Sequence, residues 1–221
     1  MTPSSHSPVR DKHAPRPSGP GRPKDLGKRA AILEAAKRLF PRDGFAGVSM
    51  DQIAAEAGVS KLTVYSHFGD KEALFAAAVR AKCEEMLPDD LFQPEPKGPL
   101  RAQLDAIATG FFALISSDEA ISTHRMMIAP GNADDPLRKL FWEAGPQRTQ
   151  AAFASFLQAR VEAGEMHIPD VARASQQFFC LLKGEMHSMM MCGLCDKPAG
   201  IDVTAHIDAT VDMFLRAYGR R

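Results

Sequence analysis

The stretch from residue 49 to 68, SMDQIAAEAGVSKLTVYSHF, constrains the fold of this chain more than any other. Ser49 and Gln52 have the spacing of a capping box, and the apolar residues that follow them recur at helical spacing. Gly58 can adopt the left-handed backbone of a tight turn, and Ser60 can cap a second short helix. This pattern predicts a helix-turn-helix, whose second helix enters the major groove of DNA. The alternative is an ordinary helical hairpin, which would not need so many exposed hydrogen-bond donors.

Charge is unevenly distributed along the 221 residues, although the formal net charge is zero. Residues 1–27 carry five Lys or Arg against two acids, and residues 89–221 carry thirteen against seventeen. A basic front and an acidic rear suit a nucleic-acid-binding head followed by a body with another task. Strand signals are almost absent, so we predict an all-α fold.

Nothing in the sequence predicts export or a membrane partner. No apolar run approaches the roughly 18 residues of a membrane-spanning helix. The N-terminal segment lacks the apolar centre of a signal peptide. Four cysteines without an export signal are typical of reduced thiols in the cytosol, so we expect a cytoplasmic protein.

Residues 1–27 are rich in Pro, Gly and Ser and have few apolar side chains, so we expect a disordered basic arm. Arg22 lies in the segment Gly-Arg-Pro-Lys just before the first helix. An arginine on such an arm can enter the narrow minor groove of A·T-rich DNA. A passive, solvated tail remains the alternative.

Two helices flank the predicted helix-turn-helix. The apolar stripe of residues 28–42 predicts the first, which Gly44 should end, and Asp70 should begin a long helix that reaches Met86. Four prolines between residues 88 and 99 indicate a linker. We therefore expect a DNA-binding domain over residues 28–87 and a separate body over residues 88–221.

The body should hold four or five more helices. Helical periodicity places them at 100–115, 118–129, 136–164, 170–193 and 202–218. Gly145 and Pro146 should bend the third of these, because proline removes a helical hydrogen bond.

Residues 28–82 resemble the DNA-binding domain of the TetR/AcrR family of bacterial transcriptional regulators. The matching residues are Leu39-Phe40, Asp43-Gly44-Phe45, Ile53-Ala54, Ala57-Gly58-Val59-Ser60, Thr63, Tyr65, His67-Phe68 and Lys71-Glu72-x-Leu74-Phe75. One departure is Leu62, where many members of the family carry glycine. The target sequence therefore cannot be transferred from relatives.

The rear of the chain is similar to the C-terminal domain of the AefR-like subgroup. The similarity rests on Arg125 to Ala129, on Leu140 to Pro146, and on Phe178-x3-Leu182-Lys183-Gly184. In this family the last two helices pair with those of a second subunit. The resemblance therefore implies a homodimer that presents two recognition helices to a palindromic operator in double-stranded DNA.

The resemblance also assigns roles in DNA binding. Tyr65 and Lys71 would contact phosphates, and Ser49 and Ser60 would add bonds where helix N-termini approach the backbone. Base edges would be contacted by Lys61, Leu62, Thr63 and His67. For His67 a packing or phosphate role is the alternative.

An effector pocket should lie within the body, and a small, hydrophobic molecule is the expected ligand. The candidate lining residues are Phe111, Phe112, Ile115, His124, Met127, Trp142, Phe153, Phe178 and Met186. Each has an alternative place in the hydrophobic core. No cofactor or metal is expected. Ligand binding should favour a state in which the fourth helix moves the two heads apart, as in a repressor, although the sequence leaves an activator open.

Cys192 and Cys195 have the spacing of zinc and thiol-redox sites. A thiol- or metal-responsive regulator that switches through this pair is therefore an alternative function. The pair falls near the expected C-terminus of a helix, where the helix dipole disfavours a thiolate. No nucleophile and base occur together in a motif that would indicate an enzyme.

Overall fold

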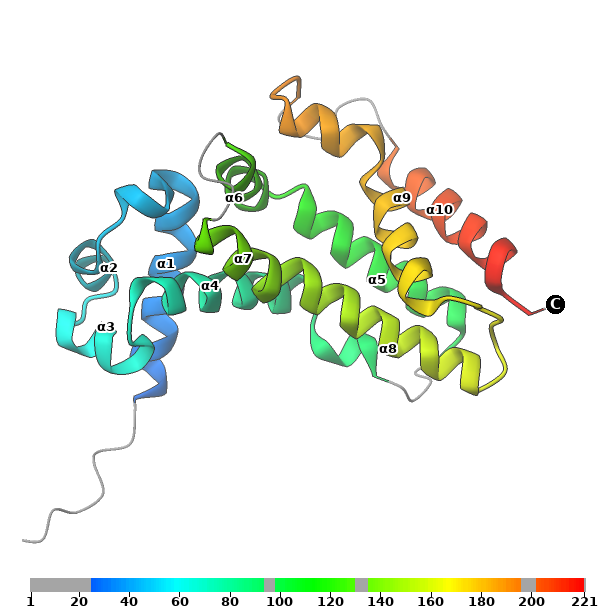
Figure 1. Ribbon diagram of the computed structural model, residues 1–221, viewed down its shortest axis with the longest axis horizontal. Coiled ribbons are helices and arrows are strands. Elements are labelled where there is room, and N and C mark those ends of the chain that lie inside the picture. Colours follow the sequence, from blue (N-terminus) through cyan, green and yellow to red (C-terminus); the bar gives the residue numbers. More distant parts are fainter. Residues whose placement is uncertain (1–24, 94–97, 130–134, 196–201, 221) are drawn as a thin grey trace, which may run out of the picture.

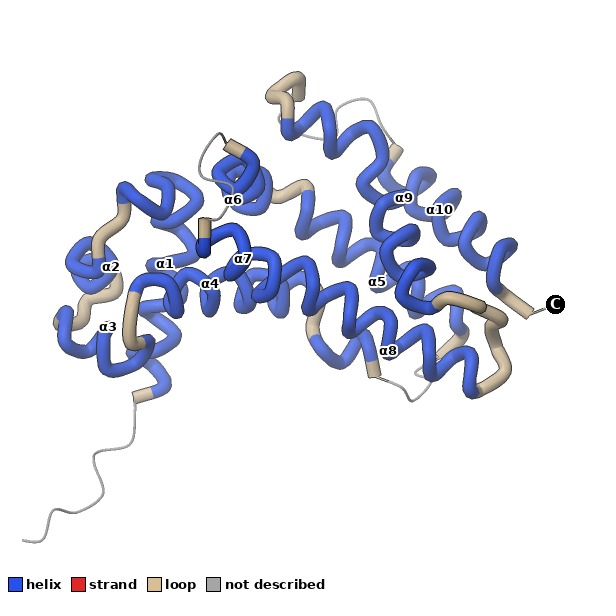
Figure 2. Tube along the Cα trace, viewed as in Figure 1, coloured by secondary structure: helices blue, strands red, loops and turns tan. Residues whose placement is uncertain are grey.

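The computed structural model describes residues 25–93, 98–129, 135–195 and 202–220, and these residues are almost entirely helical (Figures 1 and 2). The prediction of an all-α fold is confirmed. Within the described ranges the only bridge of β type joins Met166 to Gly219. Residues 1–24 of the expected basic arm, including Arg22, lie outside the described residues. Its last three residues are ordered, because Asp25 caps the first helix, which therefore begins before residue 28.

Helices α1 (Leu26–Gly47), α2 (Met50–Glu56) and α3 (Lys61–Phe68) form the head at the left of Figure 1. Helix α4 (Lys71–Met86) runs from the head into the body. Ser49 and Gln52 form the predicted capping box, with bonds of 3.2 Å and 2.7 Å. Ser60 and Asp70 cap α3 and α4 through bonds to the backbone N–H groups three residues later. These caps satisfy amide groups that have no partner inside a helix.

The sequence predicts that Gly44 ends the first helix, but in the structure Gly44 only bends it. Its φ of 74° breaks the helical backbone, and helical residues continue to Gly47. Only glycine adopts this conformation without strain. The bend turns Phe45 back onto Phe40, and the two rings lie 5.8 Å apart.

The body follows α4 without a break in packing. Its elements are the 3₁₀ turn η1 (Asp89–Phe92), α5 (Leu100–Ile115), α6 (Asp118–Ile128), α7 (Pro136–Trp142), the π-turn η2 (Glu143–Gln147), α8 (Arg148–Glu162), α9 (Val171–Met191) and α10 (Val203–Tyr218). Asp170 and Asp202 cap α9 and α10, where the sequence places these helix starts.

The π-turn η2 replaces the bend expected at Gly145 and Pro146. Pro146 has no N–H to donate, and one wider turn accommodates it between α7 and α8 without ending the helix. The interruption also brings the small Gly145 against α4, where a Cβ atom would lie 3.1 Å from Val79 Cγ1.

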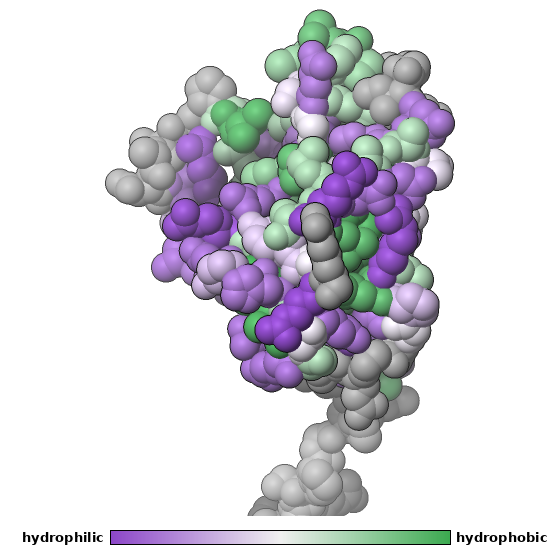
Figure 3. Space-filling model, turned by 90° about the vertical axis from the view of Figure 1, so that its right-hand side faces the viewer, coloured by the Kyte–Doolittle hydropathy of each residue, from purple (hydrophilic) through white to green (hydrophobic). Residues whose placement is uncertain are grey.

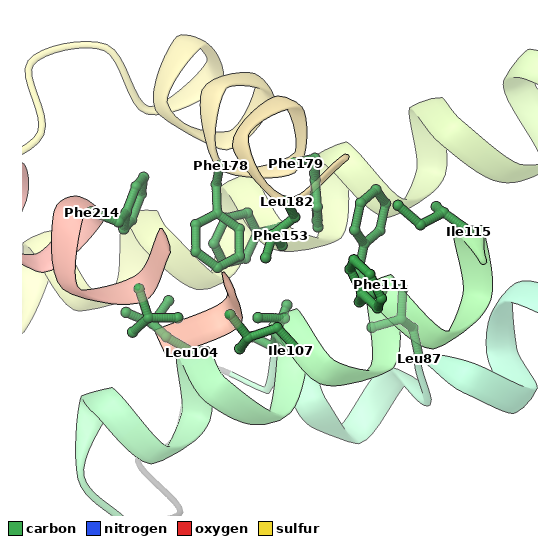
Figure 4. Close-up of a cluster of buried hydrophobic side chains, with 14 of the residues drawn as sticks. Leu87, Leu104, Ile107, Phe111, Ile115, Phe153, Phe178, Phe179, Leu182 and Phe214 are labelled. Carbon is green, nitrogen blue, oxygen red and sulfur yellow. The ribbon is translucent and has the colours of Figure 1, made fainter. Parts of the chain in front are cut away.

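Aromatic side chains fill the centre of the body (Figure 4). Phe153 from α8 and Phe178 from α9 are fully buried with their rings 4.8 Å apart, and Phe214 from α10 lies 4.9 Å from Phe178. Leu104 and Ile107 cover this cluster from α5. Burial of each such side chain contributes roughly 1.5–3 kcal/mol, so this core holds α5, α8, α9 and α10 together.

The core of the head is completed by two residues of the body. Met127 from α6 and Phe141 from α7 belong to the same buried cluster as Ile32, Leu39 and Phe75. Helix α1 packs on α6 as well as on α4. The head therefore cannot move relative to α6 and α7 without changing its own packing.

Among the residues described, no helix combines the length and the hydropathy needed to cross a membrane.

Candidate DNA-binding surface and ligand pocket

Helices α2 and α3 form the helix-turn-helix, and its turn is set by Gly58 at a φ of 65°. The Val59 N–H donates to the Ala54 carbonyl at 3.0 Å, which closes the turn. Val64 is completely buried, so it fixes the inward face of α3. The opposite face is left to solvent and carries the predicted base-contacting residues.

The exposed side chains of α3 differ in whether they already have a bonding partner within the protein. Leu62 is 79% exposed and Tyr65 is 42% exposed, and the Tyr65 hydroxyl makes no hydrogen bond in the described part of the chain. Lys61 is held by Asp51 of α2 at 2.8 Å, and this carboxylate raises the pKa of the lysine. Lys61 must therefore exchange Asp51 for a base or phosphate if it contacts DNA.

Ser49, Ser60 and Thr63 already use their hydroxyl oxygens. The Ser49 and Ser60 oxygens accept bonds from backbone N–H groups at the starts of α2 and α3, and the Ser60 and Thr63 hydroxyls lie 2.9 Å apart. A hydroxyl group can still donate while its oxygen accepts. The serines can thus cap their helices and also donate to a phosphate.

Lys71 and His67 lie at the edges of this surface. Lys71 begins α4, and its ammonium group lies 4.4 Å from the centre of the Phe45 ring. This cation–π contact leaves the charge without a carboxylate neighbour among the described residues. His67 is half-buried, and its Nδ1 has no partner in the described structure. Burial in this position suits the packing alternative for His67.

A pocket lies where the head meets the body. Its cavity volume is about 130 Å³, and its mouth is open to solvent. Seven elements contribute to it: α1, α4, α5, α6, the α7–η2 segment, α8 and α9. A molecule bound here would touch the first helix of the head directly.

Four of the nine predicted lining residues lie on the pocket wall: Phe111, Ile115, His124 and Trp142. The other five lie in the cores. Phe112, Phe153, Phe178 and Met186 belong to the core of the body, and Met127 belongs to that of the head. Apolar spacing along a helix is the same for a core and for a pocket wall, which is why the sequence did not separate them.

The sequence also missed much of the wall. Residues of α1 and α4 line the pocket, among them Lys37, Phe40, Phe75 and Lys82, and Lys183 of α9 lies there too. The lysines flank apolar stripes in the sequence, and that was the only signal for them.

Polar groups on the wall are kept mostly neutral or paired. Burial, together with the nearby Lys183, lowers the pKa of His124, whose Nδ1 lies 3.1 Å from the Ala120 carbonyl oxygen. Behind it, burial and the neighbouring His124 and Lys183 lower the pKa of His187 to about 4. Burial raises the pKa of the Cys83 thiol to about 11. At neutral pH both imidazoles and this thiol are uncharged.

Arg125 and the Cys192/Cys195 pair lie at the end of α9. Arg125, next to His124, donates to the carbonyls of Met190 and Met191 and so caps the end of α9. Cys192 forms the C-cap of α9, and both Cys192 and Cys195 are free thiols. No cluster of three or more metal-binding side chains occurs among the residues that the structure describes.

Comparison with known families agrees with both halves of the structure. Residues 32–78 match the model for bacterial regulatory proteins of the tetR family. Residues 102–220 match the C-terminal domain of AefR-like transcriptional repressors.

Individual relatives extend over nearly the whole chain. The transcriptional regulator EthR of Mycolicibacterium smegmatis is 30% identical over 198 residues, which are 87% of this chain and 83% of EthR. A putative TetR-family regulator from Mesorhizobium loti is 28% identical, with a TM-score of 0.72 over 88% of this chain and 98% of its own. The flavonoid-responsive regulator FrrA is 31% identical, with a TM-score of 0.65 over 89% of this chain and all of its own (100%).

The helix-turn-helix, the helical body and these matches lead to one conclusion. The chain belongs to the TetR family of DNA-binding transcriptional regulators, with a C-terminal domain of the AefR-like repressor type.

Proposed function

We propose that this regulator is a ligand-responsive repressor that binds a palindromic operator as a homodimer. As a TetR-family protein it is a repressor-like DNA-binding regulator and not an enzyme. The observation that carries the proposal is the pocket between α1 and the body, because a ligand there contacts the DNA-binding head itself.

The proposed coupling is mechanical. The wall includes Phe40 of α1 and Phe75 of α4, both of which also belong to the head core. A ligand that fits one arrangement of these helices better than another shifts the population by its differential affinity. We expect the bound state to change the separation of the two recognition helices, which must match the 34–36 Å between half-sites one DNA turn apart.

The proposed dimer uses α9 and α10. Exposed apolar side chains lie on these helices and just after α9: Leu181, Met189, Leu194 and Met213. Figure 3 views the molecule from the end that carries the C-terminus. Hydrophobic residues gather at the top of this view, which is the level of the end of α9 in Figure 1. A second copy would bury this surface, as isologous helix pairs do in twofold dimers.

The ligand is proposed to be small and largely hydrophobic. The wall presents six aromatic rings, and FrrA, which is named for its response to flavonoids, is 31% identical to this chain. Flavonoids are flat and aromatic, which suits such a wall.

Fluorescence anisotropy on DNA from upstream of the protein's own gene tests the proposal. We expect a palindromic segment to bind at least a thousandfold more tightly than scrambled DNA of equal length, within the roughly 10³–10⁷ range of specific binders. A small molecule that binds in the pocket should lower the affinity of the protein for this DNA and so release it. Equal and weak affinity for all sequences, including a randomised library, would refute the proposal.

A further inference from the structure

Three lysines lie on the pocket wall, and two of them have carboxylate partners. Lys37 Nζ lies 2.8 Å from Glu34 Oε1 and 2.6 Å from Glu85 Oε2. Lys82 Nζ lies 3.6 Å from Glu119 Oε2. Their charges are thus balanced by the protein itself.

Lys183 of α9 is different. It is half-buried on the wall, and no carboxylate pairs with it within the described ranges of the chain. The single acid on the wall, Glu119, is committed to Lys82. A partly desolvated cation without a counter-charge favours the binding of an anion beside it.

The two histidines and the arginine near Lys183 do not compete with it for an anion. Its neighbours His124 and His187 are neutral at physiological pH, so they present no second cation. Arg125 points its guanidinium group at the carbonyls of α9 and not into the pocket. Any anion in the pocket therefore has one free positive partner.

The rest of the wall is mostly apolar, and its remaining polar side chains, among them Thr149 and Gln150, are uncharged. It presents six aromatic rings, from Phe40, Phe75, Phe111, Phe141, Trp142 and Phe179. Burying a charged group against such surfaces without a partner is strongly unfavourable. An acidic ligand would thus be oriented in only one way, with its anionic group at Lys183 and its apolar body along the rings.

We propose that the effector is an apolar carboxylic acid whose carboxylate pairs with Lys183. This inference rests on the proposed ligand-responsive function and specifies the chemistry of its ligand. It makes Lys183 the residue that distinguishes an acid from a neutral molecule of the same shape.

Two matched pairs of probes test the inference: decanoate with decan-1-ol, and 4-phenylbutyrate with 4-phenylbutan-1-ol. Trp142 is the only tryptophan in the sequence and lies on the wall, so its emission reports occupancy. The alcohols lose less hydration on entering an apolar site, so without a cation they should bind more tightly than the acids. In the wild-type protein we expect at least one acid to bind about tenfold to a hundredfold more tightly than its alcohol.

Variants of the lysines make the test specific. Lys183→Met keeps most of the length of the side chain without its charge and should remove the preference for the acid, whereas Lys183→Arg should retain it. Lys139→Met removes an exposed lysine of α7 that does not line the pocket, and should leave the preference at its wild-type value. Circular dichroism shows whether each variant is folded.

The outcomes separate the two proposals. Equal affinity for acids and alcohols, or an acid preference that survives Lys183→Met, overturns the inference. So does the absence of binding of all four probes to a protein that still binds its operator. If instead the wild-type protein does not select any DNA sequence, the proposed function fails, whatever the probes show.

Discussion

The backbone N–H of Phe45 donates to the sulfur of Met126 at 3.1 Å, which joins the bend of α1 to α6 across 81 positions of sequence. Met127, the next residue, is buried in the head core. One side of α6 thus belongs to the head, while His124, one turn earlier, faces the pocket. Helix α6 contacts both the ligand site and the DNA-binding head, so it can transmit a change between them.

Replacement of Met126 by leucine should weaken this contact. Leucine has nearly the same volume but cannot accept the Phe45 N–H, so an amide loses its partner. We expect the free energy of unfolding to fall by about 1 kcal/mol, measured by urea denaturation. Met86→Leu serves as control, because Met86 is a partly buried methionine whose sulfur accepts no bond within the described residues. Equal effects of both substitutions would contradict the role given to the sulfur.

Leu62 offers a test of DNA recognition that leaves the fold intact. Its side chain is 79% exposed at the start of α3, so folding gains little from it. Against DNA it can pack on a thymine methyl group, a contact worth roughly 1 kcal/mol or more. We expect Leu62→Ala to lower operator affinity about fivefold to tenfold, while the unfolding free energy stays within about 0.5 kcal/mol. An equal loss on scrambled DNA would assign Leu62 to non-specific binding.

Lys71 should contribute one phosphate contact. Its ammonium group rests on the Phe45 ring and is bound by no carboxylate in the described residues, so it is available to DNA. Each phosphate neutralised adds about 0.9 to the slope of log affinity against log salt. Lys71→Ala should therefore reduce this slope by about one, measured by anisotropy at several salt concentrations. Arg173→Ala, at the start of α9 in the body, should leave the slope unchanged.

The features that the sequence predicted are the local ones. Capping by Ser49, Ser60, Asp70 and Asp170 depends on residues within one helical turn, so it could be identified without a fold. The helix-turn-helix was predictable for the same reason. Even Gly44 was identified as a breaker, although the sequence could not show that the helix resumes after it.

The pocket wall could be predicted only in part. It is formed by helices that are distant in sequence, and α1 and α4 contribute to it from the head. Phe153 and Phe111 have the same apolar spacing, but the first is sealed by Phe178 and Phe214 while the second reaches the pocket. Lys183 is a candidate partner for an anion only because the one acid on the wall, Glu119, pairs with Lys82. The sequence does not reveal this pairing.

His187 should make stability depend on pH. Its pKa is lowered from 6.5 to about 4 in the folded protein, so between these values the unfolded chain binds more protons. Stability should be unaffected above pH 6.5 and should fall as the pH drops from about 6.5 towards 4. His124, whose pKa is lowered in the same direction, adds to the effect. Because His187 is partly exposed, its slope should be smaller than the limit of about 1.4 kcal/mol per pH unit.

His187→Gln isolates this contribution from that of the carboxylates. Urea denaturation of both proteins between pH 7.5 and 4.5 gives the difference in free energy at each pH. The difference should change steadily below pH 6.5 in favour of the variant, since glutamine takes up no proton. A difference that is constant with pH would mean that His187 is protonated in the folded protein as readily as in the unfolded chain.

Two glycines set how closely the body packs against α4. A Cβ atom at Gly110 of α5 would lie 2.5 Å from the Met86 carbonyl oxygen, which cannot move without disturbing the end of α4. At Gly145 the nearest atoms are Val79 Cγ1 at 3.1 Å and Cys83 Sγ at 3.4 Å, and both belong to side chains that can adjust. We therefore expect Gly110→Ala to be the more damaging, with a loss of about 3 kcal/mol against about 1 kcal/mol for Gly145→Ala.

Thermal unfolding followed by circular dichroism ranks these variants. Gly47→Ala is the matched control, because its added Cβ would meet nothing closer than Asp43 Cβ at 3.9 Å and its φ is not positive. It should change the unfolding free energy by no more than about 0.5 kcal/mol. Gly145→Ala has a second expected effect, because Gly145 and Cys83 both line the pocket: the added methyl group should weaken ligand binding even where the protein stays folded. If Gly145→Ala proved more destabilising than Gly110→Ala, the carbonyl of Met86 would have to be more mobile than its position in the α4–α5 contact implies.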